Sequence, residues 1–270
     1  MIFSSAINGS ISIRFTKITP SSKKSLTFAE KKEREMGYQR FDEFATQYDE
    51  WFMNNEKLFE TELRLVADTL QDAGRILSIG CGSAFFEKSL RDEYGIQIIK
   101  GIEPSTSMAE IARKRVFEVE IGTGEEADYG TGLYDTVLFN GCPCYMNDLG
   151  LALRKAYASL VPGGRIVVID VPKESSFGTM YNLAMTLGTW DHPLLNDTKP
   201  QDEYPIELVK EAKWRTTADK TAVIEENGFV NIRYRQTLTT LPHYAHLVVE
   251  DPSDGYDRGS YVAIIAQKPE

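Results

Sequence analysis

Between residues 37 and 267, short apolar runs alternate with longer stretches in which apolar residues recur every three or four positions. The run Ile76, Leu77 and Ile79 is typical of a parallel strand with both faces buried, because such a strand needs no strict alternation. Similar runs predict strands at 97–101, 116–121, 134–139, 165–171, 229–236 and 260–267. Seven strands, with helices between the first five, predict an α/β fold: a doubly wound, mostly parallel sheet with helices on both faces.

Helical periodicity precedes the first strand. From residue 37 onward, aromatic side chains recur at helical spacing, at Phe41, Phe44, Tyr48, Trp51 and Phe52. Such a stripe most often packs into a core, and the alternative is that Tyr48 or its neighbours close a ligand pocket. A second helix at 56–70 leads into the strand at 76–79.

Two long insertions interrupt the C-terminal part of the chain. Residues 173–215 are too many for a simple connection, and connections of this length usually form lids or binding inserts. A helix is predicted at 175–187 within this first insertion and another at 216–227 after it, where Gly228 provides a suitable stop. The second insertion, 237–259, separates the last two strands. Aromatic and histidine side chains are frequent in both: Phe177, Tyr181, Trp190, His192, Trp214, His243, Tyr244 and His246.

The composition of the chain disfavours a membrane-spanning or nucleic-acid-binding protein. A chain of 270 residues that is 42% hydrophobic can bury the core of one large domain. No apolar run is long enough to cross a bilayer. The formal charge of −10 argues against a protein that holds nucleic acid chiefly by neutralising phosphates. A small-molecule ligand is therefore favoured.

The N-terminal stretch and the cysteines bear on location. Residues 1–36 contain no acidic residue before Glu30, and we expect a flexible extension before a domain at 37–270. A targeting peptide, or an upstream extension of a gene that starts at Met36, is the alternative. The three cysteines form neither a disulfide framework nor paired metal half-sites, so a cytoplasmic protein without a metal is predicted.

The turn after the strand at 76–79 organises the predicted site. Gly80 and Gly82 let the backbone turn tightly and approach a ligand, and Ser83 is placed to cap the following helix. Glu103 comes roughly twenty positions later, just beyond the end of the second strand, where it can accept hydrogen bonds from both hydroxyls of a ribose. Together, these residues predict a nucleoside pocket at the carboxyl edge of the sheet.

Further residues follow the other strands at this edge. Pro104 begins the next helix, which turns Met108 toward the pocket. After the third strand, backbone groups and a carboxylate can bond an adenine amino group, although a polar turn is the alternative for Thr123, Gly124 and Glu125. After the fourth strand, Asn140 and Gly141 face the same crevice.

The chain from about residue 38 to residue 267 resembles the class I S-adenosylmethionine-dependent methyltransferases, particularly the group that includes ubiquinone- and menaquinone-biosynthesis-type enzymes. The family's motifs are matched in order by ILSIGCGSA, IKGIEPSTSM, IGTGEEAD, YDTVLFNG and LVPGGRIVVIDVP. The resemblance implies a Rossmann-like fold and methyl transfer from S-adenosylmethionine to a small-molecule acceptor bound by the insertions.

The resemblance also implies a cofactor site, residue by residue. The methionine moiety would lie beside Gly80, Cys81, Gly82 and Ser83, the ribose on Glu103, with Pro104 and Met108 nearby, the adenine beside Thr123, Gly124 and Glu125, and the sulfonium near Asn140 and Gly141. Ser78 departs from the family because an acidic residue is usual there, and Ala84 stands where a third glycine is common.

Two other functions are compatible with this sequence. A nicotinamide-dependent dehydrogenase would need a glycine at position 85, where Phe85 disfavours close helix packing beside a pyrophosphate. A scaffold or regulator that binds S-adenosylmethionine without turnover is suggested by Ser78.

Catalytic groups are harder to assign. The donor's sulfonium is already activated, so the protein must mainly align the reactants and exclude water. His192, His243 and His246 are candidates for a general base, but each alone is more typical of a structural or surface residue. Tyr145 follows the fourth strand and can orient an acceptor. Cys142 and Cys144 supply only two soft ligands, which favours a packed loop over a metal centre.

Overall fold

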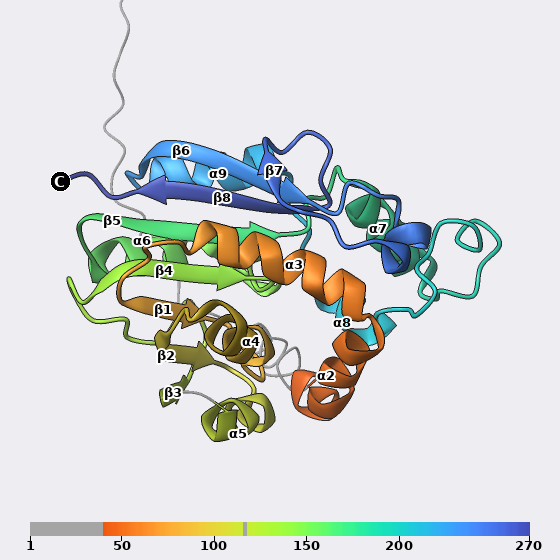
Figure 1. The fold of residues 1–270 in the computed structure, drawn as a ribbon, viewed down its shortest axis with the longest axis horizontal. Coiled ribbons are helices and arrows are strands. Elements are labelled where there is room, and N and C mark those ends of the chain that lie inside the picture. The colour runs from red at the N-terminus through yellow and green to blue at the C-terminus, as the bar shows by residue number, and fades with distance from the viewer. Residues whose placement is uncertain (1–39, 116–117) are drawn as a thin grey trace, which may run out of the picture.

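The computed structural model describes residues 40–115 and 118–270. Their eight strands form one sheet in the order β3-β2-β1-β4-β5-β8-β6-β7 (Figure 1). The strands are β1 (Ile76–Ile79), β2 (Ile98–Glu103), β3 (Glu118–Ile121), β4 (Tyr134–Asn140), β5 (Leu160–Asp170), β6 (Val230–Thr237), β7 (Ser253–Asp254) and β8 (Tyr261–Gln267). The first five are parallel, and β8 is antiparallel to both β5 and β6. The predicted α/β class is confirmed.

The strand number differs from the prediction because β7 adds a two-residue edge strand within the second insertion. The third strand is described from Glu118, and Glu103 is the last residue of β2 rather than a residue beyond it. The predicted extension at 1–36 lies outside the described residues.

Helices cover both faces of the sheet. They are α2 (Ala45–Asn54), α3 (Glu56–Thr69), α4 (Phe85–Tyr94), α5 (Thr106–Arg115), α6 (Leu149–Ser159), α7 (Ser176–Leu187), α8 (Ile206–Glu211) and α9 (Thr217–Glu226). Figure 1 shows α3 and α4 in front of the sheet, α6 and α9 behind it, and α2, α7 and α8 beyond the carboxyl ends of the parallel strands. Within the described residues, no helix is long and apolar enough to cross a membrane.

Alternation along the central strands creates two cores. In β1, Ile76 packs in the core beneath α3, whereas Leu77 and Ile79 pack in the core beneath α6 and α9. In β4, Leu138 belongs to the first core and Phe139 to the second. Successive side chains of a strand point to opposite faces, so a buried run such as β1 supplies both cores at once. This double burial fixes the carboxyl ends of β1 and β4 side by side.

Two helices begin where the sequence predicts them, and one predicted N-terminal cap is absent. Thr216 and Asp219 form a reciprocal capping box at the start of α9, and Ser175 caps α7 by accepting a hydrogen bond from the Gly178 N–H. The predicted cap of α4 is wrong. That helix begins after Ala84, which adopts φ +58°, and Ser83 makes no capping bond. Its hydroxyl donates to Asp49 of α2 and accepts from Arg115 of α5.

Candidate functional site

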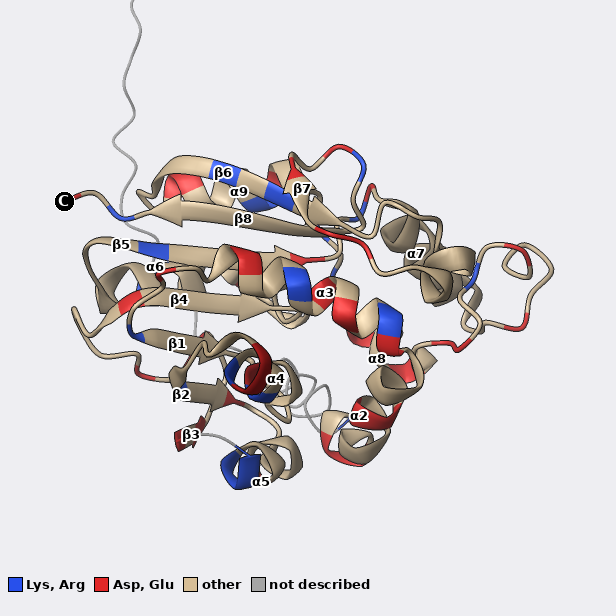
Figure 2. Ribbon diagram, viewed as in Figure 1, with Lys and Arg blue, Asp and Glu red and all other residues tan. Residues whose placement is uncertain are grey.

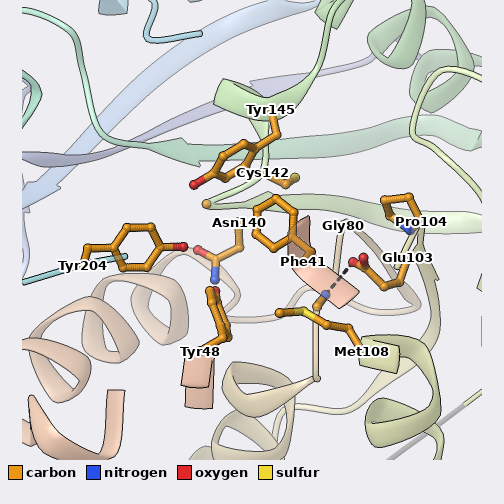
Figure 3. A pocket seen from close by; sticks show the side chains of 12 residues that line it. Phe41, Tyr48, Gly80, Glu103, Pro104, Met108, Asn140, Cys142, Tyr145 and Tyr204 are labelled. Carbon is orange, nitrogen blue, oxygen red and sulfur yellow. Dashed lines mark hydrogen bonds between the residues drawn. The ribbon is translucent and has the colours of Figure 1, made fainter. Parts of the chain in front are cut away.

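A cavity of about 510 Å³ opens at the carboxyl ends of β1, β2 and β4, and we call it the edge cavity. Figure 3 shows the side chains around it. Seven of the residues predicted from the sequence line it: Gly80, Gly82, Glu103, Pro104, Met108, Asn140 and Gly141. The remaining lining residues are Phe41, Tyr48, Cys142, Tyr145 and Tyr204.

The glycine turn of the edge cavity has no space for a larger residue at Gly80. Gly80 adopts φ +63°, and a Cβ built on it would lie 2.6 Å from the Cβ of Cys142. The Cys142 thiol donates to the carbonyl of Ile79 at 3.0 Å, which holds the loop after β4 against this turn. The loop at 142–144 is therefore packed against the turn. Within residues 40–115 and 118–270, no group of three or more metal-ligating side chains occurs.

Glu103 is held by the backbone around it. One carboxylate oxygen accepts from the Gly82 N–H at 2.8 Å, drawn as the dashed line in Figure 3, and the other accepts from the Ser105 N–H at 2.8 Å. Burial raises the pKa of Glu103 to about 7 despite these two hydrogen bonds. Each oxygen can still accept a second donor, so the group is oriented to bind a pair of hydroxyls.

Five predicted residues do not line the edge cavity: Cys81, Ser83, Thr123, Gly124 and Glu125. The polar groups of the third-strand turn are used locally. Glu125 accepts from the backbone N–H groups of Asn147 and Asp148, and the Gly124 carbonyl accepts from the Tyr129 hydroxyl. The assignment of this turn to adenine therefore stays a prediction.

The acidic group that Ser78 lacks is provided by another element. The Ser78 hydroxyl donates to Glu87 of α4 at 2.8 Å, and both side chains are buried. Burial raises the pKa of Glu87 to about 7, although the bond from Ser78 acts against this shift. A carboxyl group thus lies beside the middle of β1 even though the strand itself carries none. No sequence pattern points directly to Glu87, because an acid on an amphipathic helix usually faces solvent.

A second cavity of about 520 Å³ adjoins the first, and we call it the aromatic cavity. Tyr48, Asn140, Gly141, Tyr145 and Tyr204 line both cavities. In Figure 3 the polar ends of Tyr48, Asn140 and Tyr204 converge. The other lining residues are Trp51, Phe52, Glu62, Phe86, Cys144, Asp170, Val171, Tyr181, Trp214 and Tyr261.

The first insertion builds much of the aromatic cavity. It contributes Tyr181 from α7, together with Tyr204 and Trp214, and the rings of Tyr181 and Trp214 are stacked with centroids 5.2 Å apart. The predicted role of this insertion in ligand binding stays a prediction, and three of its aromatic side chains line a cavity. None of His192, His243 and His246 lines either cavity, whereas Tyr145 lines both.

Two buried carboxylates line the aromatic cavity, and they differ in their partners. Asp170, the last residue of β5, lies 3.7 Å from the ammonium of Lys220, and both side chains are almost fully buried. Glu62 of α3 is 8% exposed, and in the described part of the chain its carboxyl group has no hydrogen-bond or ion-pair partner. Burial alone raises the pKa of Glu62 to about 8.

Residues 40–54 cover the two cavities and are fastened at two points. Asp42 accepts from the Ser105 hydroxyl at 2.6 Å and from the Ser107 N–H at 2.9 Å, at the start of α5. Asp49 is buried and pairs with Arg115 at the end of the same helix. The aromatic stripe serves both purposes considered from the sequence, because Trp51 and Phe52 belong to the core and also line the aromatic cavity, and Tyr48 lines both cavities.

Comparison with known proteins agrees with this geometry. Residues 49–215 match a family described as a methyltransferase domain. The chain belongs to the S-adenosylmethionine-dependent methyltransferases. A solved structure from Thermotoga maritima, described as a S-adenosylmethionine-dependent methyltransferase and possible histamine N-methyltransferase, is 28% identical. It superposes with a TM-score of 0.72 over 86% of this methyltransferase and 99% of that chain.

Two curated relatives extend the comparison. An uncharacterized protein of Methanocaldococcus jannaschii is 27% identical over 228 residues, which are 84% of this methyltransferase and 98% of the relative. An uncharacterized methyltransferase of Alkaliphilus oremlandii is 26% identical over 223 residues, 78% of this chain and 94% of that one. S-adenosylmethionine is therefore the cofactor, and the dehydrogenase alternative is wrong.

Proposed function

We propose that this methyltransferase binds S-adenosylmethionine in the edge cavity and transfers its methyl group to a small molecule in the aromatic cavity. The observation that carries the proposal is the wall shared by the two cavities, formed in part by Asn140 and Gly141 at the end of β4. Because the two cavities adjoin, a donor in one and an acceptor in the other would meet without either crossing open solvent. Proximity of this kind supplies much of the rate enhancement when the donor is already activated.

The edge cavity suits the donor's chemistry. Glu103 is oriented by two backbone N–H groups and would accept hydrogen bonds from the two ribose hydroxyls. The turn from Gly80 to Ser83 would flank the methionine moiety, with Asn140 and Gly141 near the sulfonium. Thr123 to Glu125 would border the adenine.

The aromatic cavity suits a small organic acceptor. Aromatic rings form most of its walls, as is usual for sites that bind small organic molecules. Acidic side chains lie on α2, α3 and α8 near this end of the molecule (Figure 2), which disfavours a nucleic acid. The Thermotoga maritima structure, described as a possible histamine N-methyltransferase, lends support to a small-molecule acceptor.

Calorimetry with the purified chain tests the donor site. S-adenosylmethionine should bind and NAD should not. Glu103→Ala should weaken binding of S-adenosylmethionine by roughly 1 to 3 kcal/mol, because each lost hydrogen bond to a buried charged group contributes on this scale. The matched control is Glu110→Ala, an exposed acid on α5, which should bind as the wild type does. Equal affinities of the Glu103 and Glu110 variants would refute the ribose assignment.

Turnover is tested separately with a cofactor that carries a labelled methyl group. Cell extract is divided into a fraction of small molecules and a fraction of proteins and nucleic acids, and each is incubated with the enzyme. Label should enter the small-molecule fraction. Label in the macromolecular fraction alone would refute the acceptor class, and tight cofactor binding with label in neither fraction would favour a scaffold without turnover.

A further inference from the structure

We propose that the acceptor is an amine that enters the aromatic cavity as a cation, and that Glu62 binds its ammonium group. This inference rests on the proposed function, since it names the class of molecule that the second cavity accepts. Four observations support it: the burial of Glu62, its lack of a partner, the pairing of the other acid, Asp170, with Lys220, and the aromatic walls.

Glu62 lies near the middle of α3 and lines the aromatic cavity, with 8% of its surface exposed. Within residues 40–115 and 118–270 its carboxyl group has no hydrogen-bond or ion-pair partner. A buried carboxylate without a partner is strongly destabilising, and proteins almost always pair such a group. A ligand that supplies the missing positive charge would remove this cost.

The other titratable groups of the cavity do not neutralise the charge of Glu62. Asp170 already has the ammonium of Lys220 at 3.7 Å, so that pair contributes no net charge. The titratable groups that surround Glu62 are tyrosine hydroxyls. Burial, and then the nearby Glu62 carboxyl group among other charges, raises the pKa of Tyr181 and Tyr261, so both are neutral at physiological pH. When Glu62 is ionised, the cavity carries one uncompensated negative charge.

The walls of the cavity are suited to a cation with an apolar body. Trp51, Phe52, Tyr181 and Trp214 present ring surfaces, which attract ammonium groups and bury the attached carbon skeleton. An anionic acceptor would face the carboxylate of Glu62 and would be repelled. The indole N–H of Trp214 is buried without a hydrogen-bond partner among the described residues.

The charge of the bound amine must change before methyl transfer, because an ammonium nitrogen has no lone pair. The Glu62 carboxylate accepts one proton from it, because burial makes this carboxyl group more basic than an exposed glutamate. The neutral nitrogen then forms a bond to the methyl carbon while the carbon–sulfur bond breaks and its electron pair remains on sulfur. The positive charge ends on the methylated nitrogen, and the proton on Glu62 leaves to solvent with product release.

The test uses three probes of similar size that differ in charge: 2-phenylethylamine, 2-phenylethanol and 3-phenylpropionate. Their affinities are measured by calorimetry on the full chain saturated with S-adenosylhomocysteine. The amine should bind at least about tenfold more tightly than the alcohol, as expected for a desolvated charge pair with aromatic contacts, and the carboxylate should bind most weakly. Glu62→Gln should abolish the preference for the amine over the alcohol.

The matched control is Glu56→Gln, which makes the same change at an exposed position of the same helix and should keep the preference. Equal binding of the alcohol or the carboxylate by the wild type would overturn the inference, as would an amine preference that survives in Glu62→Gln. Binding of none of the probes would overturn it too. Failure to bind S-adenosylhomocysteine is a different result, because it would contradict the proposed function itself.

Discussion

Glu62 should make the free enzyme less stable as the pH rises. Burial raises the pKa of its carboxyl group from 4.5 to about 8 in the folded protein, a difference of 3.5 units. Between these two values, the folded state holds a proton that the unfolded state has lost. The stability from this proton is present below pH 4.5 and is lost progressively as the pH rises to 8. At about 1.4 kcal/mol per unit, the loss amounts to about 5 kcal/mol.

Glu62→Gln should remove this loss, because glutamine remains neutral throughout. Urea unfolding of the wild type and the variant, each without ligand, is measured at pH 5, 6, 7 and 8. The free energy of unfolding of the wild type should fall relative to the variant at each step, by at most about 1.4 kcal/mol per pH unit. Glu87 and Glu103 have pKa values of about 7 and act in the same direction, but they are unchanged in this comparison.

The same experiment on Glu56→Gln isolates the effect of burial. This variant lacks an exposed carboxylate on α3, so its free energy of unfolding should run parallel to that of the wild type across the whole pH range. A parallel course for Glu62→Gln as well would show that Glu62 is either well solvated or paired in solution. Both the pKa argument and the unpartnered charge would then be wrong.

Two other substitutions test the packing around β1. Gly80→Ala would place a Cβ 2.6 Å from the Cβ of Cys142 at φ +63°, and it should cost about 2 to 4 kcal/mol in urea unfolding and abolish calorimetric binding of the cofactor; wild-type stability would contradict the close packing. Ser78→Ala removes the hydrogen bond to Glu87 and should cost about 1 to 3 kcal/mol at pH 8. A smaller cost is expected at pH 5, where Glu87 is protonated, and a pH-independent cost would refute the role of the charge.

Local spacing was sufficient to predict the edge cavity. Gly80, Gly82 and Glu103 are positioned by short segments that follow directly from strands, and parallel strands bring such segments to one edge whatever the rest of the chain does. Asn140 and Gly141 follow from the same rule. Local spacing was not sufficient for Ser83. Its hydroxyl was predicted to cap α4, but it is hydrogen-bonded to Asp49, 34 residues away in the sequence.

The aromatic cavity could not be predicted in the same way. Glu62 occupies a helix whose sequence, EKLFETELRLVADT, is typical of a half-exposed surface element. It is buried in the folded protein, where Tyr181 and Tyr204, more than 100 residues later, line the same cavity. The aromatic content of that insertion indicated a binding role, but which rings face the cavity depends on tertiary packing.

Tyr48 links the two cavities to the same helix. It lines both of them from α2, and α2 is fastened to the rest of the molecule through Asp49 and Arg115. Any movement of α2 that releases the donor therefore also uncovers the acceptor chamber. The residence time of one product and the admission of the next substrate would then depend on the same contact between α2 and α5. In steady-state kinetics this arrangement predicts product inhibition that changes together for both ligands when Asp49 is replaced.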